Sequence, residues 1–119
     1  MNIGSTQLDG ILVLRPEGPE LGADRAEAFR QALLPELESS RWVALDLSEV
    51  EFMDSSGLGA VVAALKALRG RGELRLFGVH PRIEELFRLT GLNRVFSVDT
   101  NQVAAVTQLR AAKEKAGAA

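Results

Sequence analysis

The sequence of 119 residues predicts an α/β fold: a mixed β-sheet, mostly parallel, with an antiparallel N-terminal edge and about four covering α-helices. Three observations lead to this prediction. Short apolar runs alternate with segments of helical periodicity, which favours parallel strands joined by right-handed crossovers. The first two runs are separated only by Asp9-Gly10, a hairpin signal that makes this edge antiparallel. The length suits a single core, so residues 1–119 are expected to form one domain.

Five apolar runs are expected to form the strands. Strands at about residues 3–8 and 11–15 lie on either side of the turn and form the hairpin. The run "WVALDL", residues 42–47, is nearly continuous in apolar character, as in a strand that is covered on both faces. It is therefore expected at the centre of the sheet. The runs "ELRLFGV", residues 73–79, and "VFSV", residues 95–98, supply the remaining strands.

The first helix is predicted from Asp24 to Leu37, where large apolar residues recur every four positions. Asp24 and Glu27 form a D-x-x-E opening that resembles a capping box. Pro35 lies inside this segment, lacks the backbone N–H and clashes with the preceding turn. The helix is therefore expected to end or kink near Leu34.

Three further helices follow. The segment 56–69 carries an apolar stripe at helical spacing. Another helix begins at Pro81, a favourable first-turn residue, and stops at Gly91, which can adopt a left-handed conformation. The last helix is expected at 101–115, and residues 113–119 are expected to be a mobile tail. The residues of the last helix predicted to face inward are Val103, Val106 and Leu109.

Composition excludes several classes of function. The net charge of -2 and the pI near 5.4 leave no broad basic surface, so we expect no direct binding of nucleic acid. The chain has no cysteine and one histidine, so no metal site is expected, and no cofactor is expected. No apolar run approaches the ~20 residues that span a bilayer, and the N-terminus does not resemble a signal peptide. We therefore expect a cytoplasmic protein without membrane insertion.

The segment "EFMDSSGLGAVVAAL", residues 51–65, carries the residues that bear on function. A serine hydrolase would need G-x-S-x-G around its nucleophile, but Asp54 and Leu58 occupy the glycine positions around Ser56. Because a triad is recognised in space rather than in order, Ser56, His80 and Asp46 keep the hydrolase open as an alternative. A simpler role for His80 is to begin the following helix.

The backbone around the serines allows two further roles for this segment. Gly57-Leu58-Gly59 opens a helix, as phosphate-binding loops do, but it lacks the residues of a dinucleotide fingerprint or a P-loop. Ser55 or Ser56 could simply cap the helix, a role worth about 1 kcal/mol. However, each of the two glycines in the first turn weakens a helix by about 1 kcal/mol relative to alanine. Their presence indicates a close approach to the backbone.

Two segments together resemble the STAS domain of bacterial anti-sigma-factor antagonists. They are "LDLSEVEFMDSSGLGAVVAALK" and "LRLFGVHPRIEELFRLTGLNRVF", which carry the motifs D-S-S-G-L-G and L-T-G-L-x-R-x-F. The resemblance is strong from about Trp42 to Phe96 and extends weakly to both ends. It implies a STAS-like fold and a non-enzymatic regulator of transcription.

The resemblance also implies a mechanism called partner switching. The unphosphorylated protein would bind an anti-sigma factor that is also a serine kinase, and the phosphorylated protein would release it. A serine phosphatase would reset the cycle, and ATP would enter only as the phosphate donor of the partner kinase. The phosphorylated residue maps onto Ser56, with Ser55 as the less favoured site. The residues expected to bind the partner are Asp24, Asp54, Ser55, Ser56, Gly57, Leu58 and Gly59. If the start of the helix faces outward, Leu58 would be the apolar contact for the partner.

One departure from the family leaves alternatives open. Family members carry G-E-L-D before the first helix, whereas this chain has "GPELGADRA", with Gly22 in place of the acid. Asp24 could replace that acid or could be only the helix cap. The alternative function is a STAS subunit that docks permanently in a lipid transporter or another signalling complex, where the serine merely caps a helix.

Overall fold

The computed structural model describes residues 2–118 and contains a five-stranded sheet in the order β1-β2-β4-β6-β7. A second sheet of two short strands pairs β3 with β5. The strands are β1 (Ile3–Leu8), β2 (Ile11–Pro16), β3 (Glu20–Leu21), β4 (Trp42–Asp46), β5 (Phe52–Met53), β6 (Glu73–Phe77) and β7 (Ser97–Asp99). The helices are α1 (Ala23–Glu38), α2 (Ser55–Leu68), α3 (Pro81–Thr90) and α4 (Gln102–Ala118), with a 3₁₀ turn η1 at Leu92–Arg94.

The pairing of the strands confirms the predicted mixed sheet. β1 and β2 are antiparallel, whereas β2-β4, β4-β6 and β6-β7 are all parallel. Asp9 and Gly10 both have positive φ, 53° and 80°, which fits the two-residue turn expected between β1 and β2. Gly91 ends α3 with a φ of 77°, again as expected. The short strands β3 and β5 were not predicted, because two residues give no periodic signal.

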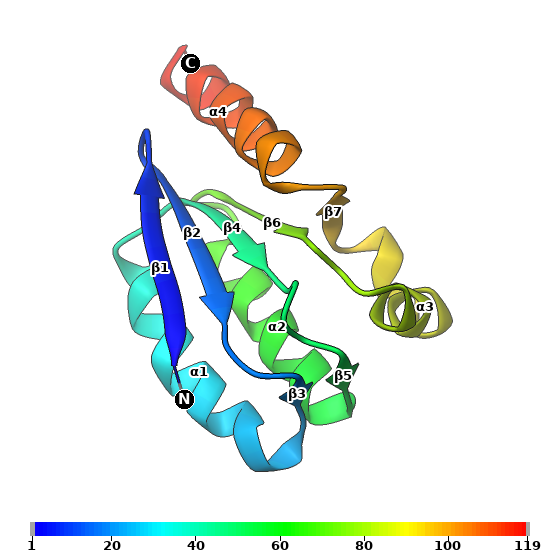
Figure 1. Ribbon diagram of the computed structural model, residues 1–119. Helices are drawn as coiled ribbons and strands as arrows, with labels where there is room; N and C mark the ends of the chain where they lie inside the picture. The colour runs from blue at the N-terminus through cyan, green and yellow to red at the C-terminus, as the bar shows by residue number, and fades with distance from the viewer. Residues whose placement is uncertain (1, 119) are drawn as a thin grey trace.

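The helices cover both faces of the sheet (Figure 1). Alternate residues of each strand point to opposite faces. Leu14 of β2 and Leu45 of β4 belong to the larger core, which α1 and α2 cover. Val13 and Ala44, their sequence neighbours, belong to a smaller core together with Leu109 of α4. The central strand β4 is therefore buried on both sides, as its continuous apolar sequence indicated.

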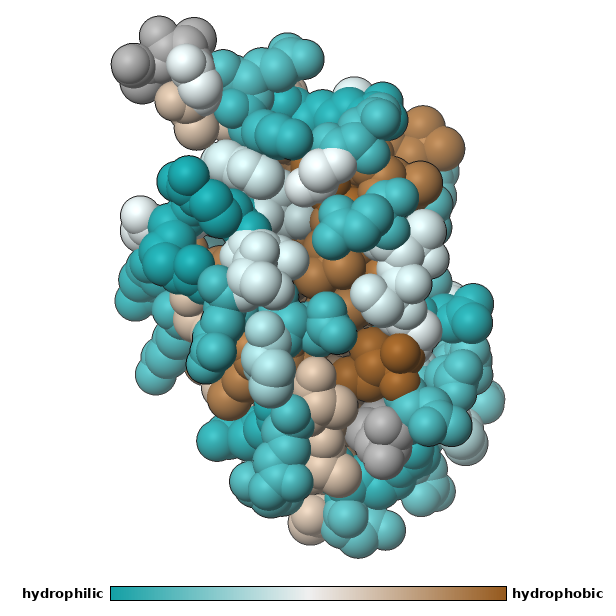
Figure 2. Space-filling model, turned by 90° about the vertical axis from the view of Figure 1, so that its left-hand side faces the viewer, coloured by the Kyte–Doolittle hydropathy of each residue, from teal (hydrophilic) through white to brown (hydrophobic). Residues whose placement is uncertain are grey.

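The edge strand β1 lies on the side of the molecule that Figure 2 presents. Hydrophilic residues cover most of this side, and the apolar residues form separate small areas. Ser5, Thr6 and Gln7 of β1 are all exposed. A polar edge discourages the addition of a further strand from another molecule.

The prediction that Pro35 ends or kinks the first helix near Leu34 is wrong. α1 continues through Pro35 to Glu38. The reason lies two residues further on, on the opposite face of the helix, where Leu37 is fully buried in the larger core while Pro35 is exposed. Burial of a leucine side chain contributes about 1.5–3 kcal/mol, which is comparable to the cost of a proline inside a helix.

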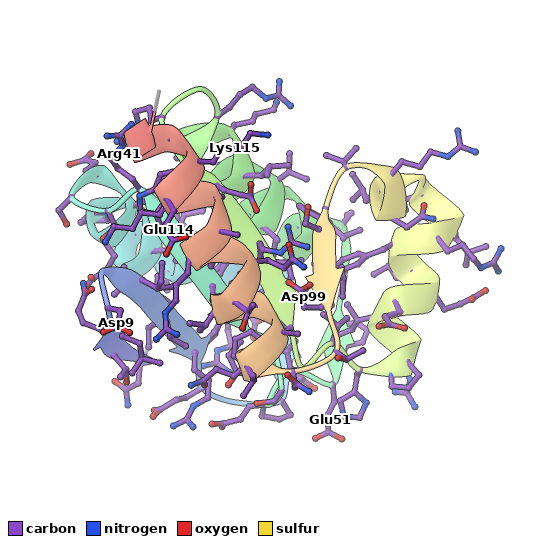
Figure 3. The ribbon with its side chains drawn as sticks, turned by 90° about the horizontal axis from the view of Figure 1, so that it is seen from above. Asp9, Arg41, Glu51, Asp99, Glu114 and Lys115 are labelled. Carbon is purple, nitrogen blue, oxygen red and sulfur yellow. The ribbon has the colours of Figure 1, made fainter. Side chains whose placement is uncertain are left out.

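The last helix also departs from expectation at both ends. Val103, which was expected to face inward, is 76% exposed, whereas Val106 and Leu109 are buried as predicted. The helix was expected to end at residue 115 but extends through Ala118, and residue 119 of the expected tail lies outside the described residues. In this segment Lys113 Nζ donates to the carbonyl oxygen of Asp9 at 3.2 Å. The hairpin turn thus lies beside α4, as Figure 3 shows.

Candidate functional site

The pairing of the short strands β3 and β5 places the starts of α1 and α2, which carry the candidate site, next to each other. Glu20 lies opposite Phe52 and Leu21 opposite Met53, so the next residues along the two chains, Gly22 and Asp54, come to lie side by side. Gly22 is the N-cap of α1 and Asp54 is the N-cap of α2. The first turns of the two helices therefore start at the same end of the molecule, next to β3 and β5 (Figure 1).

The Asp54 carboxylate holds both helix starts. Its Oδ1 accepts hydrogen bonds from the amides of Ser56 at 2.9 Å and Gly57 at 3.1 Å, which caps α2. Its Oδ2 accepts from the amide of Ala23 at 2.9 Å, the first residue of α1. The Asp54 carbonyl oxygen in turn accepts from the Leu58 amide at 2.9 Å. One residue thus satisfies backbone donors from two helices.

These hydrogen bonds favour the ionised form of Asp54. The Gly57 amide is the main cause that lowers the pKa of this carboxyl below its usual value, followed by the amides of Ala23 and Ser56. Partial desolvation acts in the opposite direction without cancelling the effect. A negative charge is therefore fixed immediately before the two serines at neutral pH.

Both serines are exposed in the first turn of α2. The alternative in which Ser55 or Ser56 caps this helix is wrong, because the Asp54 side chain accepts the capping hydrogen bonds. The exposed hydroxyls can therefore be reached from solvent without opening the helix. This arrangement can accept a group on the serine oxygen while the backbone keeps its hydrogen bonds.

The three residues after the serines face inward or lie against the neighbouring helix. Leu58 is only 7% exposed and belongs to the larger core, so it does not face outward and the prediction that it contacts the partner is wrong. Gly57 is buried against β3, where an added Cβ would overlap the Leu21 carbonyl oxygen. At Gly59 an added Cβ would lie 3.5 Å from Arg30 Nη2 of α1. The close approach indicated by Gly57 therefore comes from this chain's own backbone.

At the start of α1, the predicted capping box of Asp24 and Glu27 is wrong. The N-cap is Gly22, which has no side chain to accept a hydrogen bond, and Asp24 is exposed within the first turn. A Cβ at Gly22 would lie 3.1 Å from Asp54 Oδ2. The Asp54 carboxylate thus occupies the space beside Gly22 and bonds the neighbouring amide.

Next to this site the surface contains an apolar groove. Phe52 is 47% exposed, and its ring would lie 3.7 Å from a Cβ at Gly22. Together with Leu86 and Leu89 of α3 it lines a groove of about 300 Å³. Glu51, the residue before Phe52, is exposed and lies at the margin of the molecule in Figure 3. The surface around the serines thus combines acidic and apolar side chains.

Two residues of the hydrolase alternative, Asp46 and His80, make local contacts in their own loops. Asp46 Oδ1 accepts a hydrogen bond from the Ser48 amide at 2.9 Å, which stabilises the loop after β4. The His80 carbonyl oxygen accepts from the amides of Ile83 and Glu84, both at 2.9 Å, at the start of α3. Within residues 2–118 no group of three or more His, Asp or Glu side chains is arranged to hold a metal ion. Among the same residues no helix is long and apolar enough to cross a membrane.

Two parts of the site were not predicted from the sequence. One is the hydrogen bond from Ala23 to Asp54, although the absence of a capping side chain at Gly22 was a signal that another residue must supply the acceptor. The other is Arg30, whose guanidinium lies over Gly59. Nothing in the local sequence relates Arg30 to the serine block, because the two helices are brought together only by the fold.

Comparison with known proteins agrees with this architecture. Residues 2–105 match the family model described as the STAS domain. An anti-sigma-B factor antagonist of Listeria monocytogenes is 40% identical over 81 residues, covering 66% of this chain and 71% of that protein. An anti-sigma-B factor antagonist of Staphylococcus aureus is 35% identical over 101 residues, covering 83% and 93%. The crystal structure of an anti-sigma factor antagonist from Mycobacterium paratuberculosis superposes with a TM-score of 0.83 at 27% identity, covering 92% and 93%.

Proposed function

The chain belongs to the STAS domain family, within its anti-sigma-factor antagonist group, and from this premise we propose that it is a partner switch controlled by phosphorylation of Ser56. In the unphosphorylated state it binds an anti-sigma factor and so frees a sigma factor for transcription. In the phosphorylated state it releases the anti-sigma factor. The protein itself catalyses no reaction.

The observation that carries this proposal is the separation of roles between Asp54 and the serines. Asp54 accepts hydrogen bonds from the backbone amides of Ser56 and Gly57, so the exposed Ser56 hydroxyl is not needed to cap the helix. A kinase can therefore modify Ser56 without unfolding α2. In that step the Ser56 Oγ attacks the γ-phosphorus of ATP, the bond to ADP breaks, and the hydroxyl proton passes to a base of the kinase.

Phosphorylation acts at the interface rather than on the fold. A phosphoserine adds about -1.5 to -2 charges beside the carboxylate of Asp54, which is already ionised. A partner that packs against the start of α2 must then bury or displace this charge. Raising a dissociation constant from nanomolar to micromolar takes about 4 kcal/mol, a magnitude that an unpaired buried dianion supplies.

The partner is proposed to be both the binding target and the kinase, and a separate serine phosphatase resets the switch. The partner contacts are proposed to include Asp24, Asp54, Ser55 and Ser56, all of which are at least partly exposed. Gly57 and Gly59 contribute through the shape of the first turn rather than through side chains.

The proposal is tested by incubating the protein with ATP and candidate anti-sigma kinases from the same organism and locating the phosphate by mass spectrometry. We expect modification at Ser56, loss of modification in Ser56→Ala, and retention in the matched control Ser55→Ala. Binding of each variant to the kinase is then measured by calorimetry. Ser56→Ala should bind like the unmodified protein, and Ser56→Asp should bind more weakly.

Two outcomes would contradict the switch. If none of the kinases modifies either serine, or if Ser56→Ala and Ser56→Asp bind equally well, control by phosphorylation is excluded. Recovery of a membrane transporter ATPase instead of a kinase in a pull-down would favour the alternative of a permanently docked subunit.

A further inference from the structure

We propose that Arg30 of α1 is the residue that binds the phosphate once Ser56 is phosphorylated, forming a phosphoserine-arginine pair between α2 and α1. This inference rests on the proposed function, because it deepens the account of the same site. It concerns the side of Ser56 that faces the neighbouring helix, where the two helices pack along their lengths.

Three backbone amides in the first turn of α2 are already used within the protein. The amides of Ser56 and Gly57 donate to the Asp54 carboxylate, and the amide of Leu58 donates to the Asp54 carbonyl oxygen. A dianion on Ser56 therefore needs a side-chain donor to offset the repulsion from Asp54. Arginine is well suited, since its planar guanidinium can bond two phosphate oxygens at once.

Arg30 is placed to supply that donor. Its Nη2 lies 3.5 Å from the position that a Cβ would take at Gly59. Residues 56 and 59 are three apart on one helix face, where Cβ atoms lie about 5–6 Å from each other. The guanidinium is thus within about 9 Å of the Ser56 Cβ, a gap that the length of a phosphoserine and a rotation of the arginine side chain can close.

Arg30 also has no competing partner within residues 2–118: no hydrogen bond or ion pair of its guanidinium is found there. The other arginine in the first half of α1, Arg25, is already bound to the carbonyl oxygens of Glu17 and Glu20. Gly59 keeps the space between Arg30 and α2 open. The structure therefore holds one partly buried cation without an anion beside the proposed modification site.

Binding to Arg30 holds the phosphate on Ser56 in one position but does not neutralise its charge. A single guanidinium offsets one of about two negative charges, so the site remains net negative and still opposes a docked partner. Glu27, one helical turn before Arg30, and Asp54 add to the negative field. The pair therefore orders the phosphate without cancelling the net negative charge that opposes binding of the partner.

The test installs phosphoserine at position 56 during translation, so that no kinase is needed. The second pKa of the phosphate is then measured by ³¹P NMR in the wild-type background, in Arg30→Gln, in Arg30→Lys and in Arg69→Gln. Arg69 is exposed at the far end of α2, about 20 Å from Ser56. The matched control Arg69→Gln therefore removes the same charge far from the phosphate.

We expect Arg30→Gln to raise the phosphate pKa by about 0.5 unit or more, since a nearby cation favours the dianion. Arg30→Lys should retain part of the effect, and Arg69→Gln should leave the phosphate pKa unchanged. The Arg30 Nε–H resonance should also shift as the phosphate titrates. Circular dichroism of each variant reports whether the fold is kept.

Equal phosphate pKa values in wild type and Arg30→Gln, or equal shifts in Arg30→Gln and Arg69→Gln, would overturn the pair. Should Arg30→Gln fail to fold, the Arg30 Nε–H resonance of the wild-type phosphoprotein decides the matter, and the absence of a titration shift there would also overturn the pair. These readouts do not involve a partner. They therefore separate a failure of this inference from a failure of the partner switch, which is judged by modification of the serines by a kinase and by binding to the partner.

Discussion

Asp54 Oδ2 accepts a hydrogen bond from the Ala23 amide at 2.9 Å, although the two residues are 31 positions apart. The same carboxylate caps α2 through Oδ1. The starts of both helices are therefore joined at the proposed phosphorylation site. A change at Asp54 is expected to affect two helices, whereas an ordinary N-cap affects one.

Replacement of Asp54 by alanine should lower the free energy of unfolding more than replacement by asparagine. Asparagine keeps one oxygen acceptor, but its NH₂ group cannot accept from a backbone amide, so either the α1 bond or the α2 cap is lost. Alanine loses both. Urea unfolding of the two variants measures the order, with Ser55→Ala as the control because the Asp54 side chain, rather than a serine, supplies the cap. An Asp54→Ala variant as stable as Ser55→Ala would contradict the double cap.

The contribution of Asp54 should depend on pH. Hydrogen bonds, first of all from the Gly57 amide, lower the folded-state pKa below the ordinary value of 3.8. The stabilisation is therefore complete above that value and is lost as the pH falls through the folded-state pKa. The difference in unfolding free energy between wild type and Asp54→Asn should be constant from about pH 7 to 5 and shrink below about pH 4. A difference that stays constant down to about pH 3 would exclude this origin.

The fold was predictable where a local signal and the tertiary structure agree. The Asp9-Gly10 turn and the stop at Gly91 each require positive φ, and both segments adopt it. Pro35 shows the opposite case, because the buried Leu37 extends the helix past a residue that locally opposes it. Helix propensity alone could not compare the cost of Pro35 with the gain from burying Leu37, since the burial of Leu37 depends on the packing of α1 against the sheet.

The position of the candidate site could be predicted from the sequence, but the hydrogen bonds that join its two helices could not. The serine block marks the start of α2 in the sequence, and the structure exposes both serines there. The link from Asp54 to Ala23 depends on the pairing of β3 with β5, and each of these strands has only two residues. Leu58 belongs to the apolar stripe of its helix by spacing, and its burial follows that periodicity, which excludes the contact with a partner that an outward position would have allowed.

Replacement of Pro35 by alanine should stabilise the protein. Pro35 is exposed within α1, and alanine restores a backbone donor that proline lacks. The gain should be about 1–2 kcal/mol, less than the full cost of an internal proline, because proline also restricts the unfolded chain. Thermal unfolding measures the change in stability of Pro35→Ala and of the control Pro81→Ala. Pro81→Ala should not stabilise the protein, since proline is favourable in the first turn of α3. A loss of stability in Pro35→Ala would show that the helix has adapted to the proline.

The two glycines after the serines should respond oppositely to alanine. At Gly57 the added Cβ would overlap the Leu21 carbonyl oxygen and lie 2.8 Å from Met53 Cγ, so Gly57→Ala should cost about 2 kcal/mol or more. At Gly59 the nearest atom is the end of a flexible arginine at 3.5 Å. Gly59→Ala should therefore gain about 0.5–1 kcal/mol from helix propensity. Chemical denaturation of both variants tests the contrast, and equal effects would refute it.

Placing at position 22 the acid that the resemblance led us to expect there should destabilise this protein, because Asp54 already occupies the space. The backbone of Gly22 is extended, with φ -115° and ψ -169°, so a side chain causes no backbone strain. Its Cβ would lie 3.1 Å from Asp54 Oδ2, which requires a small shift for any residue. Gly22→Asp and Gly22→Asn share this steric cost and a similar capacity to cap α1, which is worth only a few tenths of a kcal/mol over glycine.

The two variants differ in charge, and that difference isolates the electrostatic effect. At neutral pH, Gly22→Asp should be less stable than Gly22→Asn, because two carboxylates would face each other at the start of α1. High salt should reduce the difference, and acidification below the carboxyl pKa values should abolish it. Urea unfolding across pH and salt measures it. Equal stability at neutral pH and low salt would mean that the new carboxylate turns away from Asp54 and that the site tolerates both acids.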